Sequence, residues 1–137
     1  MSGPLTAFIE DAYQDTLSLM TELRDFLAEV QAAPEDPNEG ESTDVRARIV
    51  REVSAMTRNL TEAMAWLLLQ KAAAAGEITP EEAETRADGL LVSVDAERIA
   101  AADGATLPLE IRGYVDRSRR LYDQVLSLRE MAAKQAG

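Results

Sequence analysis

Carboxylates are the most numerous groups in this sequence that could support chemistry. The 137 residues include 25 Asp and Glu but neither His nor Cys. Carboxylate-bridged two-metal sites in helical bundles use Glu-x-x-His motifs on facing helices. Imidazole or thiol catalysis needs the two residue types that are missing. The sequence therefore predicts no metal site, no cofactor and no catalytic residue, and we expect a protein that is not an enzyme.

Two smaller groups of polar residues have a structural explanation. Ser118 lies among apolar residues at helical spacing, with no general base apparent. We expect its hydroxyl to bond a backbone carbonyl at a close helix contact. The acidic residues of "TPEEAE" at 79–84 follow a capping Thr and a first-turn Pro, where negative charge suits the helix dipole. Neither group indicates a reaction.

The most basic stretch is "RGYVDRSRRLYDQVLSLR" at 112–129, with five Arg in a chain of net charge −11. Its Arg and Asp residues alternate at spacings of three and four, which is typical of a helix surface that pairs with itself. The alternative is a docking patch for an acidic protein, formed by Arg112, Arg117, Arg119 and Arg120. Nucleic-acid binding is not expected, because the basic patches are small against the overall charge and lack an aromatic platform.

Helices must position these residues, because apolar residues recur at steps of four and three along three long segments. We expect long helices over about 4–31, 43–75 and 107–134, a short helix over about 80–88, and an acidic loop at 34–42. On each long helix these residues form one row that should face the core, which we call its seam. The predicted seams are Leu5, Ile9, Ala12, Thr16, Leu19, Leu23, Phe26 and Val30; Val45, Ile49, Val53, Met56, Leu60, Ala63 and Leu67; and Leu107, Ile111, Tyr114, Ser118, Leu121, Val125, Leu128 and Ala132.

This pattern predicts an all-α fold in a single domain over residues 1–137. The expected architecture is an up-down-up three-helix bundle, with one short helix or strap between the second and the last long helices. Aromatic residues make up only 4% of the chain, which favours helices over a sandwich or barrel. We see no signal peptide and no apolar run of about 20 residues, so we expect a cytoplasmic protein that does not span a membrane.

The stretch "AMAWLLLQ" at 63–70 has more apolar surface than one seam requires. On a helical wheel Leu67 lies on the seam, Trp66 and Leu68 fall on opposite flanks, and Leu69 points nearly away from the core. The short helix and strap at 78–100 could fold over this end, a second copy could dock there as a homodimer, or a groove could receive a partner's helix or peptide. Trp66, Leu68 and Leu69 are therefore the predicted interaction residues.

Several stretches resemble the RcdA-like family of small helical proteins from alphaproteobacteria: "AWLLLQKAAAAGEIT" at 65–79, "LP" at 107–108 and "SRRLYDQVLSL" at 118–128. The resemblance covers about residues 43–132. It implies a dimeric three-helix-bundle adaptor that helps an AAA+ protease, ClpXP, to degrade cell-cycle regulators including the response regulator CtrA. Such a protein assembles with other adaptors and carries out no chemistry itself.

Carried over to this chain, the family motif falls on residues that we expect mostly to determine the fold or the dimer rather than to contact cargo. These are Trp66, Leu67, Leu68, Gln70, Gly76, Leu107, Pro108, Ser118, Leu121 and Tyr122.

We therefore expect a non-enzymatic, dimeric, cytoplasmic adaptor for regulated proteolysis, which tethers a protease to its substrate and so raises their effective concentration. Its expected partners are a second copy, an AAA+ protease, other adaptors and response regulators, with no nucleic acid, membrane or metal. One alternative is a structural or scaffolding helical bundle unrelated to proteolysis. Another is a small-molecule enzyme or carrier with a pocket near Trp66.

Overall fold

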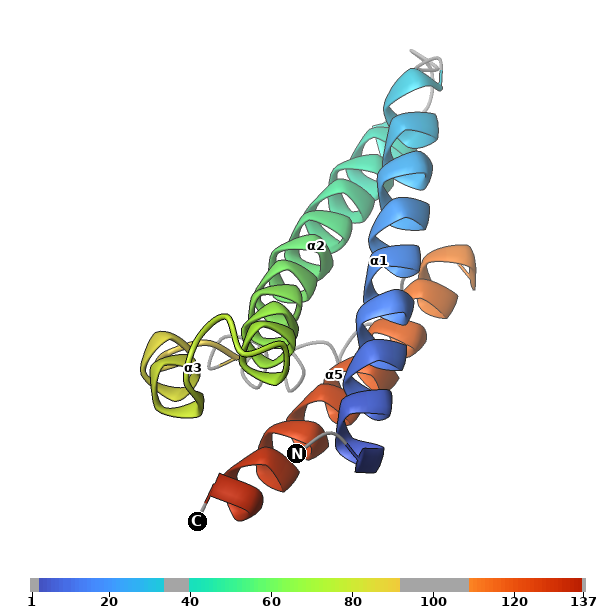
Figure 1. The fold of residues 1–137 in the computed structure, drawn as a ribbon. Coiled ribbons are helices and arrows are strands. Elements are labelled where there is room, and N and C mark those ends of the chain that lie inside the picture. Colours follow the sequence, from blue (N-terminus) through green and yellow to red (C-terminus); the bar gives the residue numbers. More distant parts are fainter. Residues whose placement is uncertain (1–2, 34–39, 92–108, 137) are drawn as a thin grey trace.

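The computed structural model describes residues 3–33, 40–91 and 109–136, and all regular structure within these ranges is helical. The helices are α1 (Gly3–Ala32), α2 (Gly40–Ala74), α3 (Pro80–Arg86) and α5 (Leu109–Ala136). Figure 1 shows the three long helices packed as a bundle, with α3 as a short arm beside one end of α2. The predicted all-α class is confirmed.

Each helix begins and ends within three residues of its predicted bounds. α2 starts at Gly40 rather than at about residue 43, so it takes in the last residues of the predicted acidic loop. The remainder of that loop, 34–39, and residues 92–100 at the end of the predicted strap lie outside the described residues.

The core lies where the seams of the three long helices meet. Thr16 is tolerated on the α1 seam because its hydroxyl donates a 2.6 Å hydrogen bond to the carbonyl oxygen of Ala12. The other predicted seam residues that are fully buried are Ile9, Leu19, Leu23 and Phe26 on α1; Val53, Met56, Leu60, Ala63 and Leu67 on α2; and Ile111, Ser118, Leu121, Val125 and Leu128 on α5.

α1 and α5 run in opposite directions. Arg117 of α5 donates two hydrogen bonds to the carboxylate of Glu22 on α1, at 2.9 and 2.6 Å. One turn further along α1, the ring of Phe26 meets the ring of Tyr114, which comes earlier on α5, with 5.1 Å between centroids. Residue numbers therefore rise along one helix as they fall along the other.

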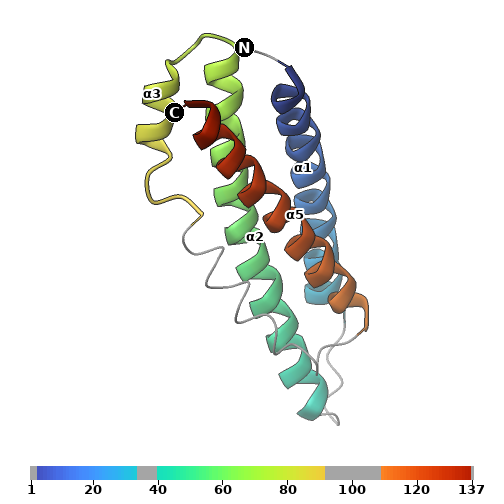
Figure 2. The same ribbon diagram turned by 90° about the horizontal axis from the view of Figure 1, so that it is seen from below.

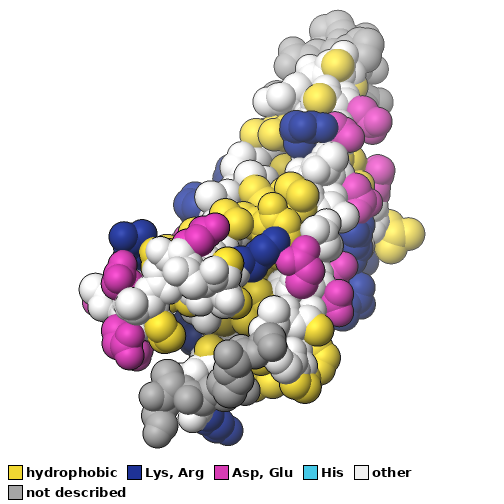
Figure 3. Space-filling view, viewed as in Figure 1, with side chains coloured by type: hydrophobic (Ala, Val, Ile, Leu, Met, Phe, Trp, Pro, Cys, Tyr) yellow, Lys and Arg dark blue, Asp and Glu magenta, His cyan; other side chains and the backbone are white. Residues whose placement is uncertain are grey.

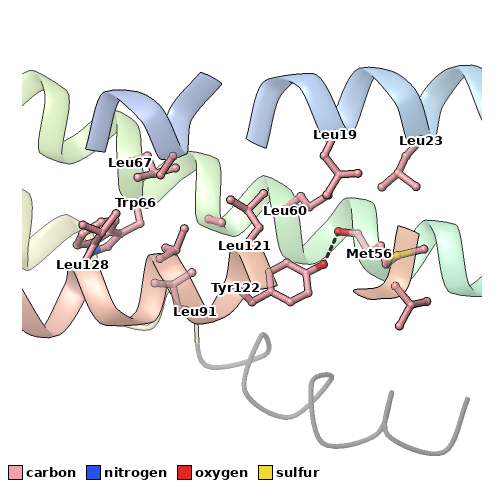
Figure 4. Close-up of a cluster of buried hydrophobic side chains, with 14 of the residues drawn as sticks. Leu19, Leu23, Met56, Leu60, Trp66, Leu67, Leu91, Leu121, Tyr122 and Leu128 are labelled. Carbon is pink, nitrogen blue, oxygen red and sulfur yellow. Dashed lines mark hydrogen bonds between the residues drawn. The ribbon is translucent and has the colours of Figure 1, made fainter. Parts of the chain in front are cut away.

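α2 and α5 run in the same direction, as Figure 2 shows. Near the middle of α2, Met56 accepts hydrogen bonds from α5: its sulfur from the Ser118 hydroxyl at 3.2 Å, and its carbonyl oxygen from the Tyr122 hydroxyl at 3.0 Å. Figure 4 places Trp66 and Leu128, both further along their helices, at the other end of the same apolar cluster. The order of the long helices is thus up-down-down, which corrects the predicted up-down-up order.

The length of the connection explains this correction. An up-down-up bundle assumes that each helix starts near the end of the preceding one. The 17 residues 92–108 could span up to about 58 Å if fully extended, whereas the 35 residues of α2 rise about 52 Å. Chain length therefore allows α5 to start at either end of α2. The heptad spacing of apolar residues is the same in both directions along a helix, so it does not indicate which way α5 runs.

The short arm after α2 returns to the core through one side chain. Gly76 leaves α2 with a φ of 77°, and Thr79 then caps α3 by accepting a 3.1 Å hydrogen bond from the backbone N–H of Glu82, as predicted. Beyond α3, Leu91 is fully buried, and its backbone N–H donates a 3.0 Å hydrogen bond to Glu62 of α2. The arm thus adds Leu91 to the core beside α2.

Replacing Tyr122 with Phe tests the contact that fixes α5 on α2. The substitution keeps the buried ring but removes the hydroxyl donor to the Met56 carbonyl, so we expect the free energy of unfolding to fall by about 1 kcal/mol. Urea unfolding followed by circular dichroism measures this change. Tyr13→Phe, at a half-buried tyrosine of α1, is the matched control and should have a smaller effect. Equal effects at the two positions would contradict the assigned contact.

Candidate interaction surface

The structure separates the three residues that the apolar stretch at 63–70 suggested. Trp66 is only 3% exposed and belongs to the same core cluster as Leu67 and Leu128 (Figure 4). Leu69 is half-buried, whereas Leu68 keeps 47% of its surface exposed. Trp66 is therefore a core residue of this chain, and Leu68 is the member of the trio that is open to another molecule.

Most of the family-motif residues serve the fold. Leu67, Ser118, Leu121 and Tyr122 are buried, Gln70 is half-buried, and Gly76 is exposed in the turn that follows α2. The Ser118 hydroxyl donates to the sulfur of Met56 on α2, not to a backbone carbonyl as expected, because that sulfur faces it across the helix contact. Leu107 and Pro108 lie outside the described residues.

Lys71 joins α2 to α1 and shows how the two helices are aligned. Its Nζ lies 2.8 Å from a carboxylate oxygen of Glu10 and 3.8 Å from the centroid of the Tyr13 ring, so one cation contacts both an anion and an aromatic face. Hydrogen bonds to Glu10 from Lys71 and then from Gln14 lower the pKa of that carboxyl group. The start of α1 is thereby held against the end of α2.

One flank of each of these two helices faces away from α5. On α1, Glu22 meets α5 and lies on the opposite flank of the seam from Tyr13. On α2, Trp66 lies on the flank toward α5, and Lys71 lies on the other. The flanks that carry Tyr13 and Lys71 form one outward surface, which we call the α1–α2 face.

Apolar side chains form a ridge along the α1–α2 face. About two turns from the Glu10–Lys71 pair, the antiparallel register brings Leu17 of α1 level with Met64 of α2, and Leu68 lies one turn nearer to Lys71. Leu17 is 44% exposed and Leu68 47% exposed, whereas Met64 is half-buried. Figure 3 shows hydrophobic side chains gathered between α1 and α2 on this face, with both acidic and basic side chains around them.

Sequence patterns alone did not identify the α1 half of this surface. Leu17 and Met20 lie beside the α1 seam rather than on it, so the heptad pattern passes over them. The available signal was a second apolar row next to the seam, formed by Tyr13, Leu17, Met20 and Leu27.

The predicted basic docking patch on α5 is divided. Arg117 forms the two-hydrogen-bond ion pair with Glu22, which lowers the pKa of Glu22 and raises that of Arg117. Arg119 is half-buried, and only Arg112 and Arg120 are exposed. Arg117 therefore joins α5 to α1, and it is not available as a docking residue.

The described part of the chain offers little for chemistry. It contains no group of three or more acidic residues placed to share a metal ion. A shallow depression of about 270 Å³ lies on α3, where its lining residues are Glu81, Glu82, Thr85 and Arg86. No helix in this part has both the length and the apolar character needed to cross a membrane.

Comparison with known proteins identifies one family. The family model described as "Protein of unknown function (DUF1465)" matches residues 5–137 of the chain. No curated protein and no solved structure matches it.

The Glu22–Arg117 pair predicts a pH-dependent contribution to stability. The folded-state pKa of Glu22 is lowered, chiefly by its hydrogen bond to Arg117, so the pair stabilises the fold above the carboxyl's unfolded pKa. That contribution is lost as the pH falls through the lower folded-state pKa. Because both side chains are about half exposed, Glu22→Gln should lower the free energy of unfolding at pH 7 by only about 0.5–1 kcal/mol.

Urea unfolding at pH 7 and in acid measures this dependence. The difference between wild type and Glu22→Gln should shrink as the pH is lowered, whereas Glu130→Gln, an exposed change on α5, should cost less at pH 7. A difference that stayed constant down to strongly acidic pH would show that the ion pair is not its source.

Proposed function

We propose that this chain, which belongs to the DUF1465 family, is a non-enzymatic adaptor that tethers other proteins through its α1–α2 face. The observation that carries this proposal is the apolar ridge on two adjacent helices, where Leu17 and Leu68 are 44% and 47% exposed. Single exposed leucines are ordinary on protein surfaces. A continuous apolar patch that spans two helices and has charged residues at its rim is typical of a protein-binding site.

The size of the ridge suits reversible binding. Complete burial of a leucine side chain contributes roughly 1.5–3 kcal/mol, and about half of that remains to be gained at each of Leu17 and Leu68. A contact of this strength holds a partner weakly by itself. It becomes effective when two partners bind one molecule, because the tether raises their local concentration.

The resemblance to the RcdA-like family directs this proposal to regulated proteolysis. On this interpretation the chain acts in the cytoplasm and binds an AAA+ protease of the ClpXP type or another adaptor, together with a cell-cycle response regulator. The exposed Arg112 and Arg120 of α5 are candidates for the second docking site that a tether requires. A structural or scaffolding bundle without a link to proteolysis is the alternative.

Affinity capture with paired variants tests the proposal. Wild-type protein used as bait should retain the AAA+ unfoldase, another adaptor or a response regulator, and Leu68→Glu should lose at least one of them because a charge interrupts the ridge. Leu109→Glu, at an exposed leucine at the start of α5, is the matched control and should retain all of them. Mass spectrometry of the captured proteins gives the readout.

Two results would contradict the proposal. If wild-type bait retains none of these three classes of protein, the scaffolding alternative is favoured. If Leu68→Glu and Leu109→Glu bind the same proteins as wild type, the α1–α2 face is not the docking surface. Circular dichroism of both variants should give wild-type helicity, because both positions are exposed.

The homodimer that the resemblance implies is a separate prediction. Since Trp66 lies in the core, it cannot form the contact between copies that the sequence suggested. Light scattering of the 14.9 kDa chain should give a mass of about 30 kDa if the homodimer forms. A mass near that of one chain would remove the homodimer from the proposal and leave the tethering role to be judged by affinity capture.

A further inference from the structure

We infer that the short arm after α2, residues 75–91, is a cover that opens from α2 while the three long helices stay packed. Leu91 holds the arm closed, and opening uncovers the flank of α2 that carries Trp66 and Leu69. The inference is independent of the proposed function, because this flank is not part of the α1–α2 face. It is supported by the backbone strain at Leu91, by the contacts that hold this residue, and by the few buried side chains of the arm.

Leu91 has a backbone conformation that leucine rarely adopts. Its φ is 70°, and in the described part of the chain it is the one residue other than glycine with a positive φ. For a residue with a side chain, this left-handed region is roughly 5–30-fold less populated than the right-handed one. Such strain persists only where the surrounding structure imposes it, and it is typical of residues that act as clamps or switches.

Two contacts hold Leu91 against this strain. Its side chain is fully buried in the core cluster, where Figure 4 shows it between Trp66 and Tyr122. Its backbone N–H donates the 3.0 Å hydrogen bond to the carboxylate of Glu62 on α2. Both contacts are lost together if Leu91 leaves the core, and its backbone can then relax. The strain therefore favours release of the arm, whereas burial and the hydrogen bond oppose it.

The rest of the arm adds little to hold it closed. Of its 17 residues only Ala83 and Leu91 are buried, and twelve are exposed. α3 packs on α2, but its hydrogen bonds are local: Thr79 caps its start, and the N–H of Ala87 donates to the carbonyl oxygen of Ala83 at 3.0 Å. A segment with few buried apolar side chains and its own hydrogen bonds opens as a unit at a lower free energy than global unfolding requires.

Glycines on both sides of α3 provide the hinges for this movement. Gly76 and Gly89 have φ values of 77° and 86°, and a Cβ added to either would meet nothing within 4 Å. Another residue would thus be strained there by its backbone alone, without a clash. The arm is therefore connected through residues that can change their backbone angles at low cost.

The arm covers a side of α2 that neither α1 nor α5 occupies. Leu69 follows Glu62 by seven residues, so both lie on the side of α2 where the carboxylate receives Leu91. Leu69 is half-buried although it points nearly away from the seam, and α3 packs on α2 beside it. Figure 2 shows α3 on the outer side of this end of α2. Opening of the arm therefore exposes Leu69 and, through the place that Leu91 leaves, Trp66.

Amide hydrogen exchange of the full-length protein tests the inference. The N–H groups of Ala83, Ala87 and Leu91 are all hydrogen-bonded in the closed arm, so opening as a unit should give them similar protection factors. These should be at least about tenfold lower than the protection factors of residues 60–67 in the buried part of α2. Protection equal to that of residues 60–67 at all three amides would overturn the inference, and so would such protection at Leu91 alone.

Matched variants separate opening of the arm from unfolding of the bundle. Gly89→Ala should lower the arm's protection factors about tenfold, because alanine is strained at a φ of 86°. Gly113→Ala, the same change at an open position within α5, should leave them unchanged. Val53→Ala, in the core away from the arm, should lower the protection of residues 60–67 about tenfold and leave that of the arm unchanged. Equal effects of Val53→Ala on arm and core, or of the two glycine variants on the arm, would overturn the inference.

A variant that holds the arm open tests what the arm covers. Leu91→Asp places a second carboxylate beside Glu62 in a buried position, so it should release the arm. Trp66 is the only tryptophan, and acrylamide quenching of its fluorescence should rise about twofold or more while circular dichroism still shows the long helices. Leu109→Asp, at an exposed leucine of α5, is the control and should leave quenching unchanged. Loss of the long helices in Leu91→Asp, or quenching equal to that of wild type, would overturn the inference.

Discussion

The packing of α5 on only one side of the antiparallel α1–α2 pair is the constraint on which the rest of the structure depends. α5 is held to α2 where Ser118 and Tyr122 meet Met56, and to α1 by the ion pair between Arg117 and Glu22. A single helix can fill only one of the two grooves that an antiparallel pair presents. The other side of the pair keeps its apolar flank, where Leu17 and Leu68 are 44% and 47% exposed.

This arrangement gives core and surface residues different tasks. The buried part of the family motif, including Trp66 and Tyr122, joins α2 to α5 and makes the bundle a rigid support. The apolar ridge lies on the opposite side of α2, where a substitution can change binding without opening the core. A motif recognised in the sequence can thus indicate the fold while the residues that contact partners lie elsewhere.

The helices and their buried seams were predictable because a heptad pattern depends only on local spacing. Thr16 and Ser118 fell on the seams as expected, and both are buried with their hydroxyls bonded. The direction of α5 was not predictable, since the spacing of apolar residues along a seam is the same in both helix directions. Trp66 and Leu68 flank their seam symmetrically, so only the position of α5 decides which of them is buried. The role of Arg117 likewise depended on Glu22, a residue 95 positions away.

Solvent paramagnetic relaxation of leucine methyl groups tests most directly whether the α1–α2 face is open in solution. A neutral gadolinium chelate relaxes methyl groups according to their distance from solvent. Leu17 and Leu68 should be relaxed strongly, while Leu19, Leu60 and Leu67, which are at most 2% exposed, should be protected. Protection of Leu17 and Leu68 to the level of Leu67 would mean that this face is already covered, and the central claim would be wrong.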